Sequence, residues 1–186
     1  MRKIYLQKHD VYYAEKMAEL LSAPEVSSAL ALQPYETTVD AMRDFIREMN
    51  LEEMMGNHIS RMIMNEDFEL IGVITLNNRN DHSKTCHIST WLGVAYWGLG
   101  YNTLAKEKML FFAFTELRMH TVFAGARVEN FRSRKAQRKL PYITLYAEKK
   151  YPDELLSLER RENAYCLLNA IEQVDFMKWY SQKIAI

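Results

Sequence analysis

The segment from Tyr96 to Phe114, YWGLGYNTLAKEKMLFFAF, constrains the fold more than any other part of the chain. Two of the chain's six glycines, Gly98 and Gly100, stand one residue apart directly before a helical apolar pattern. The predicted helix runs from about residue 101 to residue 118, and its apolar surface is wide enough to require burial against a sheet on more than one side. We therefore expect a strand, a glycine turn, a helix and another strand at the centre of the fold.

Patterns on either side of this segment predict a mixed α/β protein. Alternating or continuous apolar runs predict strands at 2–8, 58–65, 68–76, 84–94, 120–128, 142–150 and 163–170. Helical spacing predicts one helix after Asp10, one from Thr38, a short basic helix at 129–140 and a terminal helix at about 170–184. The stretch 23–37, which contains two prolines, is expected to be a loose connection. We expect one domain over residues 1–186, with the terminal helix as an appendage.

Composition argues against several classes of protein. Apolar residues make up 48% of the chain, which suffices for a substantial core and argues against disorder. Lysine plus arginine and aspartate plus glutamate balance at 24 each, so net charge favours neither nucleic acid nor an anionic membrane. The longest strongly apolar run, MLFFAF, is far shorter than the roughly 20 residues of a membrane helix, and the charged N-terminus lacks a signal-peptide core.

The cysteines and histidines give no metal or disulfide pattern. Cys86 and Cys166 lack CxxC spacing, and the histidines lack HxxxH and HExxH spacing. Reduced thiols in a cytoplasmic protein without a metal are therefore expected.

A glycine turn before a helix suits a phosphate group. The helix N-terminus offers unpaired N–H groups, and glycine lets the backbone come close to the ligand. A P-loop would need Gly-Lys-Ser/Thr, but Tyr101 and Asn102 follow Gly100. A dinucleotide-binding turn would need a third glycine where Thr103 stands. The pyrophosphate of coenzyme A remains, beside the alternative of a plain strand-to-helix turn.

Short motifs around the turn follow one another in a specific order: Ile71-Gly72, Trp91-Leu92, Tyr96 to Tyr101, Ala113-Phe114, His120-Thr121-Val122, Asn130 to Ser133, and Lys139-Leu140. This order resembles the GNAT acyltransferase superfamily, in particular its ribosomal-protein N-terminal acetyltransferase branch. The resemblance covers the layout of roughly residues 2–170. It implies a central, mixed and mostly antiparallel twisted sheet flanked by helices, with splayed strands at 91–94 and 121–128 that form an acyl-CoA slot.

The resemblance also implies the residues of the site. The strand end at 91–94 would pair with the pantetheine arm, and the backbone at 97–102 would hold the pyrophosphate. The implied cofactor-binding set is Trp91, Leu92, Gly93, Val94, Trp97, Gly98, Leu99, Gly100, Tyr101, Asn102 and Asn130. Asn130 and Ser133 match the family's Asn-x-x-Ser as the catalytic pair, with the Ser133 hydroxyl near the cofactor sulfur as the acid. A purely structural N-cap is the alternative role for Asn130.

Some positions depart from the family's pattern. Gln137 stands where many members have a tyrosine acid, Pro141 replaces a glycine, and Asn102 replaces alanine or glycine. The general base is not identified, although Glu148 and Glu154 lie in a segment that could reach the substrate.

The expected function is acetyl-CoA-dependent N-acetylation, with acetyl-CoA as co-substrate and a primary amine as acceptor. The amine, on a protein N-terminus or a small molecule, would attack the thioester directly in a ternary complex. A catalytically weak or inactive acyl-CoA-binding or regulatory module on the same fold is the alternative, and a nucleotide-dependent protein is a weaker third. No membrane or nucleic-acid partner is expected, and a homodimer through the terminal helix or strand is compatible with the sequence.

Overall fold

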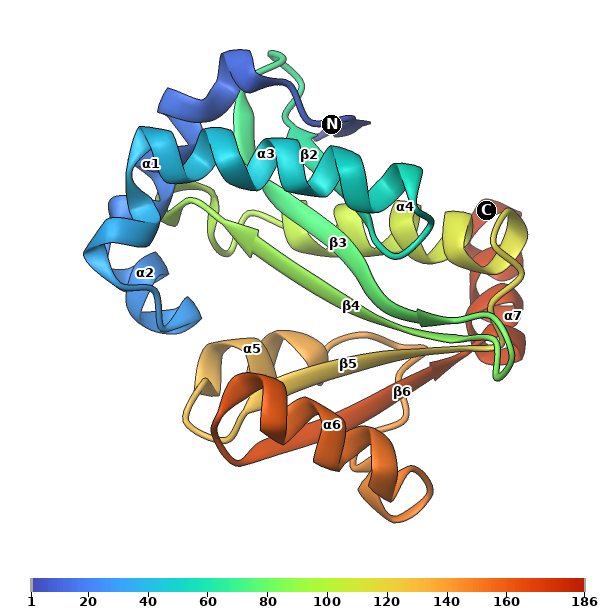
Figure 1. Cartoon of the computed structure of the whole chain (residues 1–186). Helices are drawn as coiled ribbons and strands as arrows, with labels where there is room; N and C mark the ends of the chain where they lie inside the picture. Colours follow the sequence, from blue (N-terminus) through green and yellow to red (C-terminus); the bar gives the residue numbers. More distant parts are fainter. Residues whose placement is uncertain (1, 186) are drawn as a thin grey trace. The chain divides into compact units, whose positions relative to one another are not determined.

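The computed structural model describes residues 2–185, and its elements are shown in Figure 1. In chain order the strands and α-helices are β1 (Tyr5–Gln7), α1 (Ala14–Ser22), α2 (Pro24–Leu30), α3 (Val39–Met54), β2 (Ile59–Met64), β3 (Leu70–Asn80), β4 (Thr85–Leu92), α4 (Tyr101–Thr115), β5 (Thr121–Arg127), α5 (Phe131–Gln137), α6 (Pro152–Glu162), β6 (Cys166–Glu172) and α7 (Gln173–Ile184). Short 3-10 turns lie at Val11–Tyr13, Pro34–Thr37, Val94–Tyr96 and Ala147–Lys149.

The six strands form one sheet in the order β1-β2-β3-β4-β5-β6. The pairs β1–β2, β2–β3 and β5–β6 are antiparallel, whereas β4 and β5 are parallel. The predicted mixed and mostly antiparallel sheet is therefore confirmed. A parallel pair needs a long crossover connection, and the glycine turn with α4 supplies it.

The residues group into two compact units, which are described separately below. The first unit comprises Met1–Asn77 and Thr90–Met109. The second unit comprises Asn78–Ser89 and Leu110–Ile186. The strands β3 and β4 contribute residues to both.

The core of the first unit forms where α1 and α3 cover one face of the strands. Figure 1 shows α3 across β2 and β3. Alternate residues of β2, Met62 and Met64, pack in one cluster with Met17 of α1 and Ile46 of α3. The period-2 alternation of a strand and the 3.6-residue period of a helix bring these side chains to one interface. These strand methionines are core residues.

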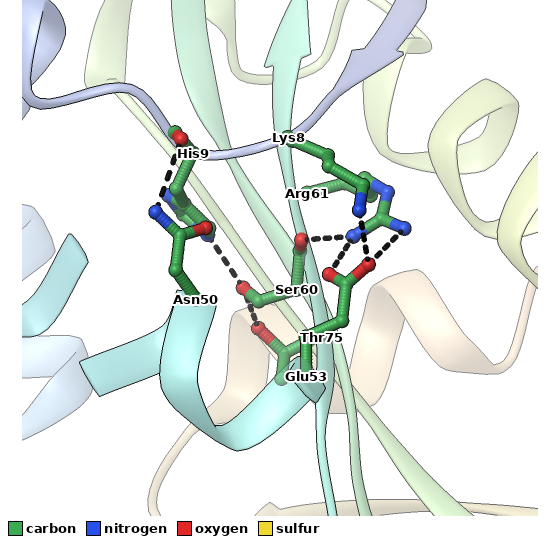
Figure 2. Close-up of polar contacts among 7 residues, drawn as sticks. All are labelled: Lys8, His9, Asn50, Glu53, Ser60, Arg61 and Thr75. Carbon is green, nitrogen blue, oxygen red and sulfur yellow. Dashed lines mark hydrogen bonds and ion pairs between the residues drawn. The ribbon is translucent and has the colours of Figure 1, made fainter. Parts of the chain in front are cut away.

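A buried polar network lies beside this core (Figure 2). His9, which follows β1, is only 6% exposed, and its Nε2 lies 2.8 Å from Ser60 Oγ. Ser60 Oγ in turn lies 2.7 Å from Thr75 Oγ1 on the neighbouring strand β3. Asn50 of α3 donates to the His9 carbonyl, at 3.3 Å. We call His9, Ser60 and Thr75 the His9 network; it ties the chain after β1 to β2 and β3, and the Asn50 hydrogen bond adds α3.

The core of the second unit lies between β5, β6 and the helices that cover them. Figure 1 shows α6 across β5 and β6, and Leu158 of α6 packs with Phe123 of β5 and Leu168 of β6. A Cβ on Gly125 would collide with Leu158 Cδ2, so α6 approaches β5 closely because this residue is glycine. The terminal helix α7 is anchored by Phe176, which is fully buried and lies 5.4 Å from Phe114 between ring centroids.

Three sequence-based expectations are wrong. Residues 142–150 do not form a strand: they contain one isolated bridge, Thr144 to Ala170, and the 3-10 turn Ala147–Lys149. The helix α6 was not predicted, although Pro152 opens it and Asn163, at φ 47°, closes it in the left-handed conformation. The connection at 23–37 is not loose, because Pro24 stands at the first turn of α2, where proline is tolerated.

Candidate active site

The glycine turn of the first unit adopts a conformation that glycine favours. Gly98 has φ +73° and Gly100 has φ +91°, both in the left-handed region, and α4 begins at the next residue. A Cβ at either glycine would meet nothing within 4 Å, so backbone conformation and not space is what requires glycine here. The Trp97 N–H donates to the Val94 carbonyl at 3.1 Å, so the turn is braced by the chain before it.

The strand end before the turn is held by close backbone packing. A Cβ on Gly72 of β3 would collide with the Trp91 carbonyl oxygen and lie 2.9 Å from Leu92 Cα. The Gly93 N–H donates to the Ile71 carbonyl at 2.9 Å, and the Trp97 indole N–H donates to the Leu92 carbonyl at 2.7 Å. Gly72 therefore lets the end of β4 approach β3, and the Trp97 side chain ties the glycine turn back to that strand end.

The first turns of α4 carry a buried acceptor that the described residues do not satisfy, and a buried lysine. The Asn102 Oδ1 atom is buried and has no hydrogen-bond partner among the described residues. Lys106, one helical turn later, is also buried, and burial lowers the pKa of its ammonium group to about 8. Tyr101 is tied down differently, because its hydroxyl donates to Glu66 at 2.9 Å.

In the second unit, Asn130 and Ser133 lie together at the start of α5. The Ser133 N–H donates to Asn130 Oδ1 at 2.9 Å, so Asn130 is the N-cap of α5. The structural role weighed for Asn130 from the sequence is thus present.

Gln137, a departure from the family's pattern, orients the Ser133 hydroxyl. The Tyr146 N–H donates to Asn169 Oδ1 at 3.0 Å, and Asn169 Nδ2 donates to Gln137 Oε1 at 2.6 Å. The Gln137 amide group therefore presents its N–H donors to Ser133 Oγ at 3.2 Å and to the Gly125 carbonyl at 3.1 Å. Because Ser133 Oγ accepts this bond, its own proton is left for another acceptor.

The two glutamates that the sequence offers as bases have different partners. Glu148 Oε1 accepts the backbone N–H of Leu168 at 3.0 Å, which is a structural contact. Glu154 Oε2 lies 2.9 Å from His87 Nε2. The sequence pattern of the histidines suggested no role for His87 beyond the absence of metal spacing, and the contact with Glu154 joins residues 67 positions apart.

The basic residues at 127–139 are largely engaged with neighbours. Arg127 pairs with Glu162 at 3.0 Å, Arg134 donates to the Val128 carbonyl at 2.7 Å, and Arg138 donates to the Tyr146 hydroxyl at 2.8 Å. Within residues 2–185, no group of three His, Cys, Asp or Glu side chains is placed to hold a metal ion. In the same part of the chain, no helix combines the length and apolarity needed to cross a membrane.

Comparisons with known proteins agree with this geometry. Residues 3–142 match the family model described as Acetyltransferase (GNAT) domain. The uncharacterized N-acetyltransferase p20 of Bacillus licheniformis is 28% identical over 142 residues, which cover 75% of this chain and 79% of that protein.

Solved structures show the same fold. The RimJ protein of Mycobacterium smegmatis in complex with CoA-disulfide has a TM-score of 0.71 at 19% identity, over 91% of this chain and 81% of that one. The spermidine N-acetyltransferase of Vibrio cholerae, in complex with CoA and spermine, has a TM-score of 0.71 at 13% identity, over 94% and 98% of the two chains. The chain therefore belongs to the GNAT acetyltransferase family and is an acyltransferase, as its motif order predicts.

Proposed function

We propose that this enzyme transfers the acetyl group of acetyl-CoA to a primary amine, on a protein N-terminus or a small molecule, by direct attack in a ternary complex. The observation that carries the proposal is the left-handed glycine turn at Gly98 and Gly100, directly before α4 in a chain of the GNAT family. A helix N-terminus offers N–H groups and partial positive charge to an anion, and this one would hold the pyrophosphate. RimJ and the spermidine N-acetyltransferase were both solved with coenzyme A or a derivative of it bound.

The unsatisfied acceptor on α4, Asn102 Oδ1, supports a ligand at this place. An unpartnered buried acceptor such as Asn102 Oδ1 costs about 1–3 kcal/mol. Phosphate oxygens only accept hydrogen bonds, so an N–H or O–H group of the cofactor's pantetheine arm would be the donor that satisfies it. In this proposal the backbone at 97–102 binds the pyrophosphate, and the strand end Trp91, Leu92, Gly93 and Val94 lies along the pantetheine arm. The Leu92 carbonyl and Gly93 N–H already have protein partners, so they would fix the strand end.

Ser133 is the proposed proton donor to the departing sulfur. Its hydroxyl accepts a hydrogen bond from Gln137, which leaves its proton free to be donated. Gln137 would thus act as a positioning residue in place of the family's tyrosine, and Asn130 would hold the first turn of α5 as its cap. Coenzyme A supplies the activated acetyl group, so the protein's part is to orient the reactants and move protons.

Free-thiol release tests the proposal. The protein is incubated with acetyl-CoA and two acceptors, a peptide with a free N-terminus and spermidine, and the rate is compared with that of buffer. Turnover with at least one acceptor is expected, and Ser133→Ala should lower kcat while leaving the rise in melting temperature caused by coenzyme A unchanged. Binding of coenzyme A without turnover on either acceptor would favour the alternative of an acyl-CoA-binding module.

A further inference from the structure

A buried histidine–glutamate pair in the second unit has no role in the function described so far. His87 lies on β4, and its side chain is 4% exposed. Its Nε2 lies 2.9 Å from Glu154 Oε2, in the first turn of α6, where the Glu154 side chain remains 32% exposed. The Phe123 ring of β5 flanks the imidazole, with ring centroids 5.2 Å apart.

The other ring nitrogen of His87 is an unused acceptor. A carboxylate can only accept a hydrogen bond, so Glu154 fixes the tautomer that carries its proton on Nε2. The Nδ1 atom then holds a lone pair, and it is buried without a hydrogen-bond partner among the described residues. A buried polar atom without a partner is rare in a folded protein and indicates a ligand or water that binds there.

The surroundings keep His87 neutral and able to accept a proton. Burial lowers the pKa of His87, the hydrogen bond to Glu154 opposes this, and the charge of Arg161 on the same helix lowers the pKa further. A base must be unprotonated at the working pH, and its conjugate acid must be stabilised once it forms. Glu154 provides that stabilisation, in the way the carboxylate of a catalytic triad supports its histidine.

The His87–Glu154 pair lies where the backbone pairing of β4 and β5 ends. Their parallel register includes Thr85–His87 and Thr121–Phe123, and its last pair is His87 with Phe123, although both strands continue. Two residues further along β5, the Gly125 carbonyl accepts from Gln137, which also contacts Ser133. Two residues of a strand span about 7 Å. His87 is thus paired with β5 at Phe123, and the Gln137–Ser133 contact meets the same strand two residues later, at Gly125.

We propose that His87 is the general base of acetyl transfer, with Glu154 as its positioning residue; this rests on the proposed function. The amine nitrogen attacks the thioester carbonyl carbon and forms the C–N bond, and an amine proton passes to His87 Nδ1, directly or through one water. The C–S bond then breaks, and the thiolate takes a proton from Ser133 or solvent. The imidazolium returns its proton to Ser133 or solvent, so the amide and free coenzyme A are the only products.

Three variants on two elements test the pair. His87→Gln keeps a neutral hydrogen-bonding side chain but cannot serve as a base, and Glu154→Gln keeps an acceptor but removes the charge. Asp153→Asn is the matched control, since Asp153 is an exposed acidic neighbour in the same turn of α6. Turnover with the peptide and spermidine is measured against pH, and coenzyme A binding is measured by melting temperature.

We expect H87Q to lower kcat by about 100-fold or more while coenzyme A still raises its melting temperature. E154Q should lower kcat by about tenfold and move the acidic limb of kcat/KM to lower pH, because the group that raises the pKa of His87 is gone. The acceptor's own titration is common to both proteins and cancels in this comparison. D153N should match the wild type.

The possible outcomes distinguish a failure of the His87 proposal from a failure of the proposed N-acetylation. If kcat of H87Q is within about threefold of the wild-type value, His87 is not the general base, and the proposed N-acetylation is unaffected. No wild-type turnover with either acceptor overturns the proposed function and the base together. If H87Q does not fold, E154Q provides the test. An acidic limb of kcat/KM that is unchanged in E154Q would also refute a base formed by His87 and Glu154.

Discussion

The buried His9 should make the stability of the protein depend on pH in a calculable way. Burial and, secondarily, the charge of Arg61 lower the pKa of His9 from 6.5 to about 4, although Glu53 opposes this. Figure 2 shows the Arg61–Glu53 ion pair beside the His9 network. Among residues 2–185, His9 Nδ1 has no hydrogen-bond partner, so a protonated ring would bury an unpaired N–H.

The sign and magnitude follow from linkage. His9 takes up a proton more readily in the unfolded chain, so its contribution to stability is full above pH 6.5 and is lost as the pH falls toward about 4. The whole shift corresponds to about 3 kcal/mol, at about 1.4 kcal/mol per pH unit. Between about pH 8 and about pH 5, His9 alone should remove about 2 kcal/mol from the free energy of unfolding.

Urea unfolding followed by tryptophan fluorescence at these two pH values measures the effect. His9→Gln cannot take up the proton, so its free energy of unfolding should fall by about 2 kcal/mol less than that of the wild type over the same interval. Burial also lowers the pKa of His87, but that residue is present in both proteins and cancels in the difference. Equal pH dependence in the wild type and H9Q would refute the reasoning.

Three further substitutions give separate tests. Gly98→Ala and the control Gly56→Ala change glycines at φ +73° and +78° in open space, so each should cost about 1–2 kcal/mol of stability. Only G98A should weaken coenzyme A binding in a titration. An equal loss of binding in both variants would contradict pyrophosphate binding at the glycine turn. Gly125→Ala should cost about 1–3 kcal/mol in urea unfolding because its Cβ collides with Leu158, and no loss would mean that α6 yields freely. Burial lowers the pKa of Lys106 from 10.5 to about 8, so wild-type stability falls as the pH drops through that interval. Lys106→Met should therefore raise the free energy of unfolding by about 1–3 kcal/mol near pH 7. A lower free energy of unfolding in this variant would show that the ammonium has a partner.

Much of the fold could be predicted because its signals are local. The alternation of β2, the apolar run of β3 and the caps at Asp10 and Thr38 each depend on neighbours within a few residues, and the structure has strands and helices there. The segment at 142–150 reads as a strand by the same rule, but it makes a single bridge to the edge strand β6, at Ala170, and then enters the 3-10 turn Ala147–Lys149. Strand formation depends on a distant partner, which local pattern does not contain.

The sequence by itself determined the family, the glycine turn and the Asn130–Ser133 motif, because these depend on residue identity and short spacing. Only the tertiary structure decided what those residues touch. His87 and Glu154 lie 67 residues apart in the chain, and Gln137 and Asn169 lie 32 apart, yet each pair is hydrogen-bonded. Such contacts form only when elements far apart in the chain pack on one another, and no local pattern carries that information.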